Sequence, residues 1–87
     1  MKWSRMRDMQ YVYILESMRD KSRFFGTTND LKARLHQHNN GETKSIKSKA
    51  PFHTLWYCCF EDKHKALEFE HFLKSDAGHA FISKHIV

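Results

Sequence analysis

A glutamate inside an apolar helical stripe is the residue of this sequence whose type and position most directly suggest chemistry. Residues 63–74 have helical spacing, and at about 100° per residue one arc of that helix is apolar. The arc consists of Ala66, Leu67, Phe69 and Leu73. Glu70 falls inside the arc, whereas Glu68 points roughly the opposite way. Because an unpaired buried carboxylate is costly, Glu70 requires a salt bridge, a raised pKa or a bound cation.

Two interpretations of Glu70 stay open from the residues alone. The structural one is an ion pair with Arg34 or with a lysine. The functional one is a divalent-metal ligand, since a single carboxylate together with water and substrate phosphate oxygens suits magnesium.

Arg34 and His38 form a second candidate pair. They lie four residues apart in a segment whose apolar positions Leu31 and Leu35 recur at helical spacing. The pair is therefore about 60° around the helix from the leucines, at the rim between core and solvent. Arg34 could instead only pair with Glu70, and His38 could be an exposed side chain near a helix end with no catalytic use.

The elements that must position these side chains follow from the apolar pattern. Residues 11–15 alternate as a strand with Tyr11 and Tyr13 on one face, residues 17–22 form a hairpin loop, and residues 23–27 a second strand. In that second strand Phe24 and Phe25 point to opposite faces, and Gly26 permits close backbone approach.

The rest of the chain predicts a third strand, three helices and a loop. Thr28 or Asn29 caps a helix of roughly ten residues that ends at residues 39–41, and residues 41–51 form a flexible basic loop. Residues 54–60 are apolar throughout, as in a strand buried on both faces. Asp62 caps the helix that carries Glu70, and residues 76–85 form a short last helix. Residues 1–9 are predicted to be a flexible lead to one domain at 10–85.

Composition narrows the classes of partner. With 15 Lys and Arg against 10 Asp and Glu, the 87-residue chain carries a formal net charge of +5, which favours an anionic partner such as nucleic acid. Lys44, Lys47 and Lys49 of the basic loop are candidate phosphate contacts, although a solvated loop would look the same.

Cysteine usage and hydropathy indicate the compartment. Cys58 and Cys59 are adjacent and read as small core residues, so no disulfide framework is expected and a reducing compartment follows. No segment is apolar enough for a membrane span or a signal peptide. We expect a cytoplasmic protein with no membrane partner, and a monomer rather than an oligomer.

In these motifs the sequence resembles the GIY-YIG endonuclease superfamily, specifically its small single-domain members of the UPF0213 kind. The likeness spans about residues 11–84. It consists of Tyr-Val-Tyr at 11–13, Phe-Phe-Gly at 24–26, Gly-Thr-Thr-Asn-Asp-Leu at 26–31 with Arg34 and His38, and Ala-Leu-Glu-Phe-Glu at 66–70 with Leu-Lys-Ser at 73–75. Order and spacing together make the resemblance strong for fold.

The resemblance implies an α+β fold, a three-stranded antiparallel sheet flanked by helices, with an active site on one sheet face. It also implies metal-dependent hydrolysis of nucleic-acid phosphodiesters with Mg²⁺ or Mn²⁺, on DNA rather than RNA. Carried over to this sequence, Tyr13 matches the tyrosine of the first triplet, Arg34 the family arginine, His38 a position often held by His or Tyr, and Glu70 the metal-binding glutamate.

Phe24 is the departure from the family pattern, because it stands where the second triplet has tyrosine. Phenylalanine keeps the ring but cannot donate a hydrogen bond or accept a proton. If the second tyrosine activates water, the base is lost; if the first does so, Tyr13 remains.

Three functions stay open at this stage. The first is a metal-dependent endonuclease, with activity reduced by Phe24. The second is a nucleic-acid-binding module of the same fold that lost its chemistry. The third is a protein-interaction domain that uses exposed aromatic residues such as Trp3 or Phe52.

Overall fold

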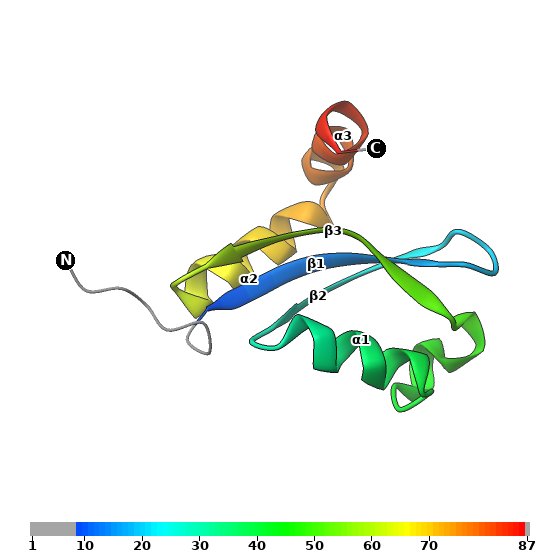
Figure 1. Cartoon of the computed structure of the whole chain (residues 1–87). Helices are drawn as coiled ribbons and strands as arrows, with labels where there is room; N and C mark the ends of the chain where they lie inside the picture. Colours follow the sequence, from blue (N-terminus) through cyan, green and yellow to red (C-terminus); the bar gives the residue numbers. More distant parts are fainter. Residues whose placement is uncertain (1–8, 87) are drawn as a thin grey trace.

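The fold consists of one three-stranded sheet with helices on both faces (Figure 1). A computed structural model describes residues 9–86. Along the chain the elements are β1 (Gln10–Ser17), β2 (Arg23–Thr28), α1 (Leu31–Asn39), the 3₁₀ helix η2 (Lys44–Lys49), β3 (Phe52–Phe60), α2 (Lys63–Leu73) and α3 (Asp76–His85). The predicted α+β class with a three-stranded antiparallel sheet is confirmed.

The sheet has the strand order β2-β1-β3, so β1 is central and pairs antiparallel with both edge strands. Tyr13 lies opposite Gly26 of β2 and Tyr57 of β3. The β1·β3 register shifts between Ile14 and Leu15, because Ile14 pairs with Trp56 but Leu15 pairs with Thr54. One extra residue of β3 is thereby left in a β-bulge, which reverses the alternation of faces beyond it.

The two faces of the sheet support two separate apolar clusters. On one face, fully buried Val12 and Ile14 pack with Ala66 and Leu73 of α2 and with Ile82 of α3. The clusters agree with the arrangement in Figure 1, where α2 and α1 lie on opposite sides of the sheet. Burying aliphatic side chains of this size contributes about 1.5–3 kcal/mol each.

The second cluster lies on the α1 side of the sheet. Tyr13, Leu15 and Phe52 are its buried members, with Leu31 and Leu35 of α1 packed against them.

Two predictions are wrong in this part of the fold. The strand β1 runs on to Ser17, which is buried and donates to the carbonyl of Lys49 at 2.6 Å. Phe52 is only 3% exposed, so it is not an exposed aromatic for partner binding, and Trp3 lies outside the described residues.

Each α-helix begins at a side-chain cap. Asp30 caps α1 by accepting from the Ala33 N–H at 3.0 Å, so the prediction of Thr28 or Asn29 as the cap is wrong. Thr28 instead supports the turn, accepting from the Asp30 N–H at 3.1 Å. The predicted helices after Asp62 and over residues 76–85 are confirmed, with Ser75 capping α3.

Two segments differ from their predictions. The predicted loop at 41–51 contains the helix η2, because its backbone turns on i→i+3 bonds such as Ile46 N–H to Thr43 at 3.2 Å. The strand β3 is not buried on both faces, because it is a sheet edge: Tyr57 is 54% exposed and Cys59 is exposed. Cys59 is therefore not a core residue. Both cysteines are free, as expected.

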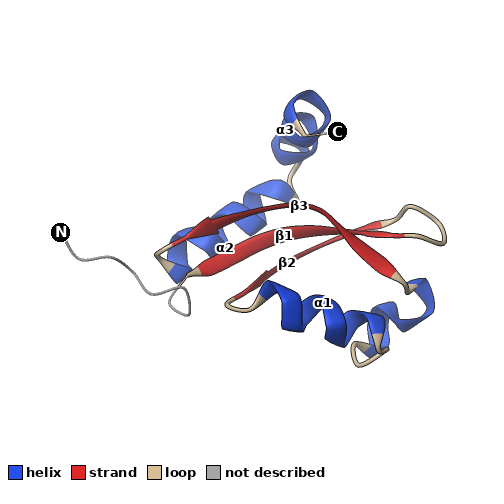
Figure 2. Cartoon of the chain, in the orientation of Figure 1, coloured by secondary structure: helices blue, strands red, loops and turns tan. Residues whose placement is uncertain are grey.

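Short loops connect the helices and strands of the domain (Figure 2). No helix within residues 9–86 is long and apolar enough to cross a membrane.

Gly78 of α3 packs closely against the backbone at the end of α2. A Cβ at this position would lie 2.0 Å from the Phe72 carbonyl oxygen and 2.6 Å from the Leu73 Cα, both backbone atoms. We expect Gly78→Ala to lower the free energy of unfolding by about 1–3 kcal/mol or more, since overpacked backbone must move. Urea unfolding measures the loss. Ser83→Ala, at an exposed position of α3, is the matched control and should stay within about 0.5 kcal/mol.

Candidate active site

Tyr13 and Gly26 define the centre of a pocket on the α1 side of the sheet. They face each other across β1 and β2, and a Cβ on Gly26 would lie 2.2 Å from the Tyr13 hydroxyl oxygen and 2.4 Å from its Cζ. The phenol therefore lies flat over a strand position that only glycine can occupy. This crossing brings a side chain of the central strand toward the outer edge of β2.

His38 contacts the Tyr13 phenol on the opposite side of the pocket. Its Nε2 lies 3.3 Å from the Tyr13 hydroxyl, and its Nδ1 lies 2.8 Å from the Thr43 hydroxyl. At 7% exposed, His38 is buried, so the alternative of an exposed helix-end histidine is wrong. Burial, and then the charge of Arg34, lower the pKa of His38, which keeps the imidazole neutral at pH 7.

Arg34 lies on the same helix one turn earlier and lines the same pocket. Burial raises the pKa of the Tyr13 phenol, and nearby Glu70 adds to the rise, whereas the Arg34 guanidinium opposes both. The net pKa is raised, so the phenol holds its proton at neutral pH. Among the described residues, Glu70 forms its salt bridge with Lys74 and not with Arg34. The Arg34 guanidinium is therefore available to an anion in the pocket.

Glu70 reaches the pocket from α2, at the edge of β2. Its Oε1 accepts from the Thr27 hydroxyl at 2.5 Å, and its Oε2 accepts from the Lys74 ammonium at 2.9 Å. The Glu70 side chain is only 17% exposed. Burial raises the pKa of this carboxyl, but the bonds from Thr27 and Lys74 outweigh burial, so the pKa is lowered and the group is charged.

Of the two open interpretations of Glu70, the structure shows the ion pair with a lysine, and metal binding stays a prediction. The lysine of the structural interpretation is Lys74, one helical turn along α2 and half exposed. Leu67, predicted in the same apolar arc, is 46% exposed, so the buried part of the arc does not include it.

The site offers a divalent cation one carboxylate. Within residues 9–86 no group of three Asp, Glu, His or Cys side chains could hold a metal by itself. A cation that takes one protein carboxylate and completes its shell with water and phosphate oxygens, as Mg²⁺ does, fits a charged Glu70 at the wall of an open pocket. The Lys74 side chain that bonds to Oε2 is half exposed, so its ammonium can move into solvent and leave that oxygen to a cation.

Phe24 lines the pocket beside Tyr13, as its place in the second triplet predicts. Its ring packs edge-on against Phe52, with ring centroids 5.5 Å apart. The ring therefore keeps its packing role on this face, while Phe25 stacks on His79 on the other face at 6.5 Å. No hydroxyl is supplied at position 24.

The three predicted lysines lie on η2, at the pocket rim that Ser45 and Ile46 form. Lys49 pairs with Asp20 of the hairpin turn. Lys44 and Lys47 are exposed, and neither lines the pocket itself.

Two site residues were missed from the sequence. Thr27 and Thr43 orient Glu70 and His38 respectively through their hydroxyls. A signal existed for the first, because a carboxylate in an apolar stripe demands a donor and Thr27 stands beside the glycine of the triplet. No signal existed for Thr43, which reaches His38 only through the turn after α1.

The pocket thus unites four side chains from three elements in about 380 Å³. They are Tyr13 of β1, Arg34 and His38 of α1, and Glu70 of α2. The sequence profile of the GIY-YIG catalytic domain matches residues 9–80 of the chain. The chain belongs to the GIY-YIG family. Its fold is therefore that of a nuclease-like domain.

Relatives place this GIY-YIG domain among the UPF0213 proteins. It is 38% identical to a UPF0213 protein of Haloquadratum walsbyi over 71 residues, which cover 80% of this chain and 79% of the relative. It is also 38% identical to one from Vibrio campbellii over 64 residues, 72% of this chain. That match spans only 61% of the Vibrio protein's length.

A solved structure supports the same placement. The solution NMR structure of a UPF0213 protein from Bacillus halodurans superposes with a TM-score of 0.55 at 29% identity. The superposition covers 90% of this chain and 86% of the other.

The pKa of His38 tests the electrostatics of the pocket. In an NMR titration of the His38 ring resonance we expect a midpoint below 6.5, and Arg34→Gln should move it upward by removing a nearby positive charge. Lys32→Gln, on the exposed side of the same helix, is the matched control and should leave the midpoint unchanged.

The same shift carries a stability consequence. Because the folded pKa lies below the unfolded value, the unfolded chain binds more protons between the two, and the free energy of unfolding rises with pH up to about 6.5. A His38 midpoint at or above 6.5 would contradict the burial and charge argued for this site.

Proposed function

We propose that this domain hydrolyses nucleic-acid phosphodiesters with the help of Mg²⁺ or Mn²⁺, on DNA in preference to RNA. The observation that supports the proposal is the convergence of a phenol, an imidazole, a guanidinium and a carboxylate on one pocket, with Tyr13 and His38 in hydrogen-bond contact. Phosphodiester hydrolysis needs an anion clamp, a proton acceptor and stabilisation of developing charge. Each side chain can supply one of these.

Arg34 provides the anion clamp. Its guanidinium can donate two parallel hydrogen bonds to the non-bridging oxygens of a phosphate, and the charge stabilises the more negative transition state. The exposed Lys44 and Lys47 on the rim add positive charge for the flanking phosphates.

Tyr13 and His38 provide a proton path. As the water oxygen bonds to phosphorus and the bond to the leaving sugar oxygen breaks, the water proton passes to the Tyr13 oxygen, and Tyr13 gives its own proton to Nε2 of His38. The lowered pKa of His38 makes this acceptor available at pH 7. The leaving oxygen takes a proton from solvent, since position 24 supplies no hydroxyl.

Thr43 sets the tautomer in this scheme. If its hydroxyl accepts from Nδ1–H, Nε2 carries the free lone pair that the Tyr13 proton requires. Glu70 would hold the divalent cation, which when bound supplies Lewis-acid polarisation of the phosphate. Thr27 keeps the Glu70 carboxylate oriented toward the pocket.

Plasmid nicking tests the proposal. We expect cleavage of supercoiled DNA that requires Mg²⁺ or Mn²⁺ and that falls about 10²- to 10⁴-fold in Tyr13→Phe, with comparable or larger losses in Arg34→Ala and Glu70→Gln. Agarose gels report nicked against supercoiled product, and a structured RNA assayed in parallel tests the preference for DNA.

Glu68→Gln is the matched control for Glu70→Gln. It removes the same charge from the same helix at a side chain that is 66% exposed and distant in angle from the pocket face. Cleavage absent under both metals, or lost equally in both glutamine variants, would overturn the proposal.

A second candidate is a nucleic-acid-binding module without chemistry, and the packing of Phe24 against Phe52 is the observation that favours it. Phe24→Tyr separates the two candidates. If the site lacks only that hydroxyl, cleavage should rise about 10²-fold. Phe25→Tyr, which adds the same hydroxyl on the opposite face, should not raise it.

A silent Phe24→Tyr variant has a defined meaning as well. Together with wild-type binding that weakens as salt rises, and weakens further in a Lys44→Ala, Lys47→Ala double variant, it would leave the binding module as the function.

A further inference from the structure

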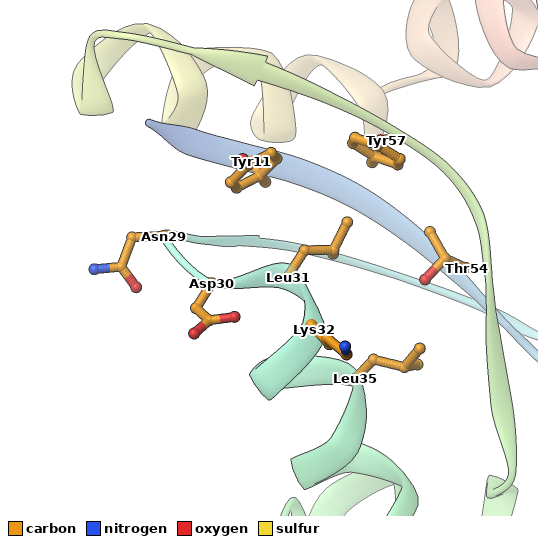
Figure 3. Close-up of a pocket in the computed structure, with 8 residues that line it drawn as sticks. All are labelled: Tyr11, Asn29, Asp30, Leu31, Lys32, Leu35, Thr54 and Tyr57. Carbon is orange, nitrogen blue, oxygen red and sulfur yellow. The ribbon is translucent and has the colours of Figure 1, made fainter. Parts of the chain in front are cut away.

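A second cavity of about 640 Å³ lies on the same sheet face, toward the start of α1. Figure 3 shows the rings of Tyr11 and Tyr57 on one side of it and the side chains of Leu31 and Leu35 on the other. Its volume falls in the range of small-molecule and nucleotide sites. None of the catalytic side chains described above lines it.

The β-bulge in β3 brings two residues of that strand to one wall of this cavity. Thr54 and Tyr57 are three residues apart, so in a regular strand they would face opposite sides of the sheet. Because the register shifts between them, Thr54 lies opposite Leu15 and Tyr57 opposite Tyr13, and both join the α1 face. The bulge therefore adds an exposed aromatic ring and a hydroxyl to one wall.

The two tyrosines form an incompletely covered aromatic surface. Their ring centroids are 6.0 Å apart with the planes tilted by 59°, and Tyr57 is 54% exposed. A ring of this size at a sheet edge, over a cavity, leaves a π-face free to stack on a flat ligand. The facing wall carries one basic and one acidic side chain, Lys32 and the helix-capping Asp30.

We infer that this cavity binds one unpaired nucleobase of the strand whose phosphate lies in the Tyr13 pocket. The inference rests on the proposed function for the identity of the ligand. The base stacks on Tyr57, its edge contacts Leu31 and Leu35, and the Thr54 hydroxyl can bond with a base heteroatom. Base stacking on aromatic side chains tolerates any sequence, because every base has a π-face.

The position of the cavity relative to the catalytic pocket supports a shared strand. Tyr11 and Tyr13 are alternate residues of β1 on one face, so their Cα atoms are about 6.6 Å apart and the two cavities are neighbours on the sheet. The helix α1 spans both cavities as well, with Leu31 and Lys32 at the first and Arg34 and His38 at the second. One strand can therefore contact both.

Binding without metal tests the inference separately from cleavage. With EDTA present and about 50 mM salt, fluorescence anisotropy measures the affinity for a labelled oligothymidylate of about ten nucleotides and for an abasic strand with the same number of phosphates. We expect the wild type to bind the abasic strand about 5- to 150-fold more weakly, as stacking of one base predicts.

Tyr57→Ser should bind both strands with the weaker affinity, whereas Tyr57→Phe should behave as wild type because it keeps the ring. Met18→Ser is the matched control: it removes another exposed apolar side chain, 61% exposed in the hairpin turn and outside both cavities. The abasic comparison uses the wild-type chain, so it stands even if a variant folds poorly.

Equal affinity for the two strands, or equal losses in Tyr57→Ser for both, would overturn the inference. So would a wild-type molar mass in solution that falls on Tyr57→Ser, because the cavity would then hold a second copy of the chain. Base-dependent binding without metal-dependent nicking would leave the inference standing and remove the hydrolysis proposed above.

Discussion

The close approach of the Tyr13 phenol to Gly26 is the constraint on which the arrangement of the site depends. A Cβ at Gly26 would occupy the space of the hydroxyl, so the ring can cross β2 only above a glycine. That crossing places one oxygen within reach of His38 from α1 and of the field of Glu70 from α2. Two helices on opposite faces of the sheet thereby contribute to one pocket.

The surroundings of Tyr13, His38 and Glu70 determine the protonation state of each side chain. Burial and Arg34 keep His38 neutral, and burial keeps the Tyr13 phenol protonated. The hydrogen bonds from Thr27 and Lys74 keep Glu70 ionised in spite of its burial. A neutral acceptor, a protonated relay and a charged carboxylate are the resting states that the proposed hydrolysis requires.

The bulge in β3 is one extra residue in an edge strand, and it changes which side chains lie on the α1 face. The additional residue places Thr54 and Tyr57 together on the α1 face, in the wall of a cavity beside the Tyr13 pocket. An edge strand accepts such an insertion because its outer side carries no partner strand. The same sheet face thus carries a polar pocket and an aromatic cavity along a single helix.

The sequence by itself determined the elements and the spacing of the site residues. The apolar periods of 2 and 3.6 residues placed the strands and helices, and Glu70 was distinguished from Glu68 because only one of them falls in the apolar arc. These are local properties, since a side chain's direction follows from its position in its own element. The prediction of Thr28 or Asn29 as the cap of α1 was wrong, because Thr28, Asn29 and Asp30 can all cap a helix and the turn geometry selects Asp30.

Only the tertiary structure decided which partners those side chains meet. The Tyr13 contact to His38, the Thr27 contact to Glu70 and the shift of Tyr57 to the α1 face depend on how α1, α2 and the bulge in β3 pack in the folded domain. Such contacts and the strand register require segments far apart in the chain to pack to within tenths of an ångström. Residue periodicity carries no information about such distances, because they result from the packing of the whole domain.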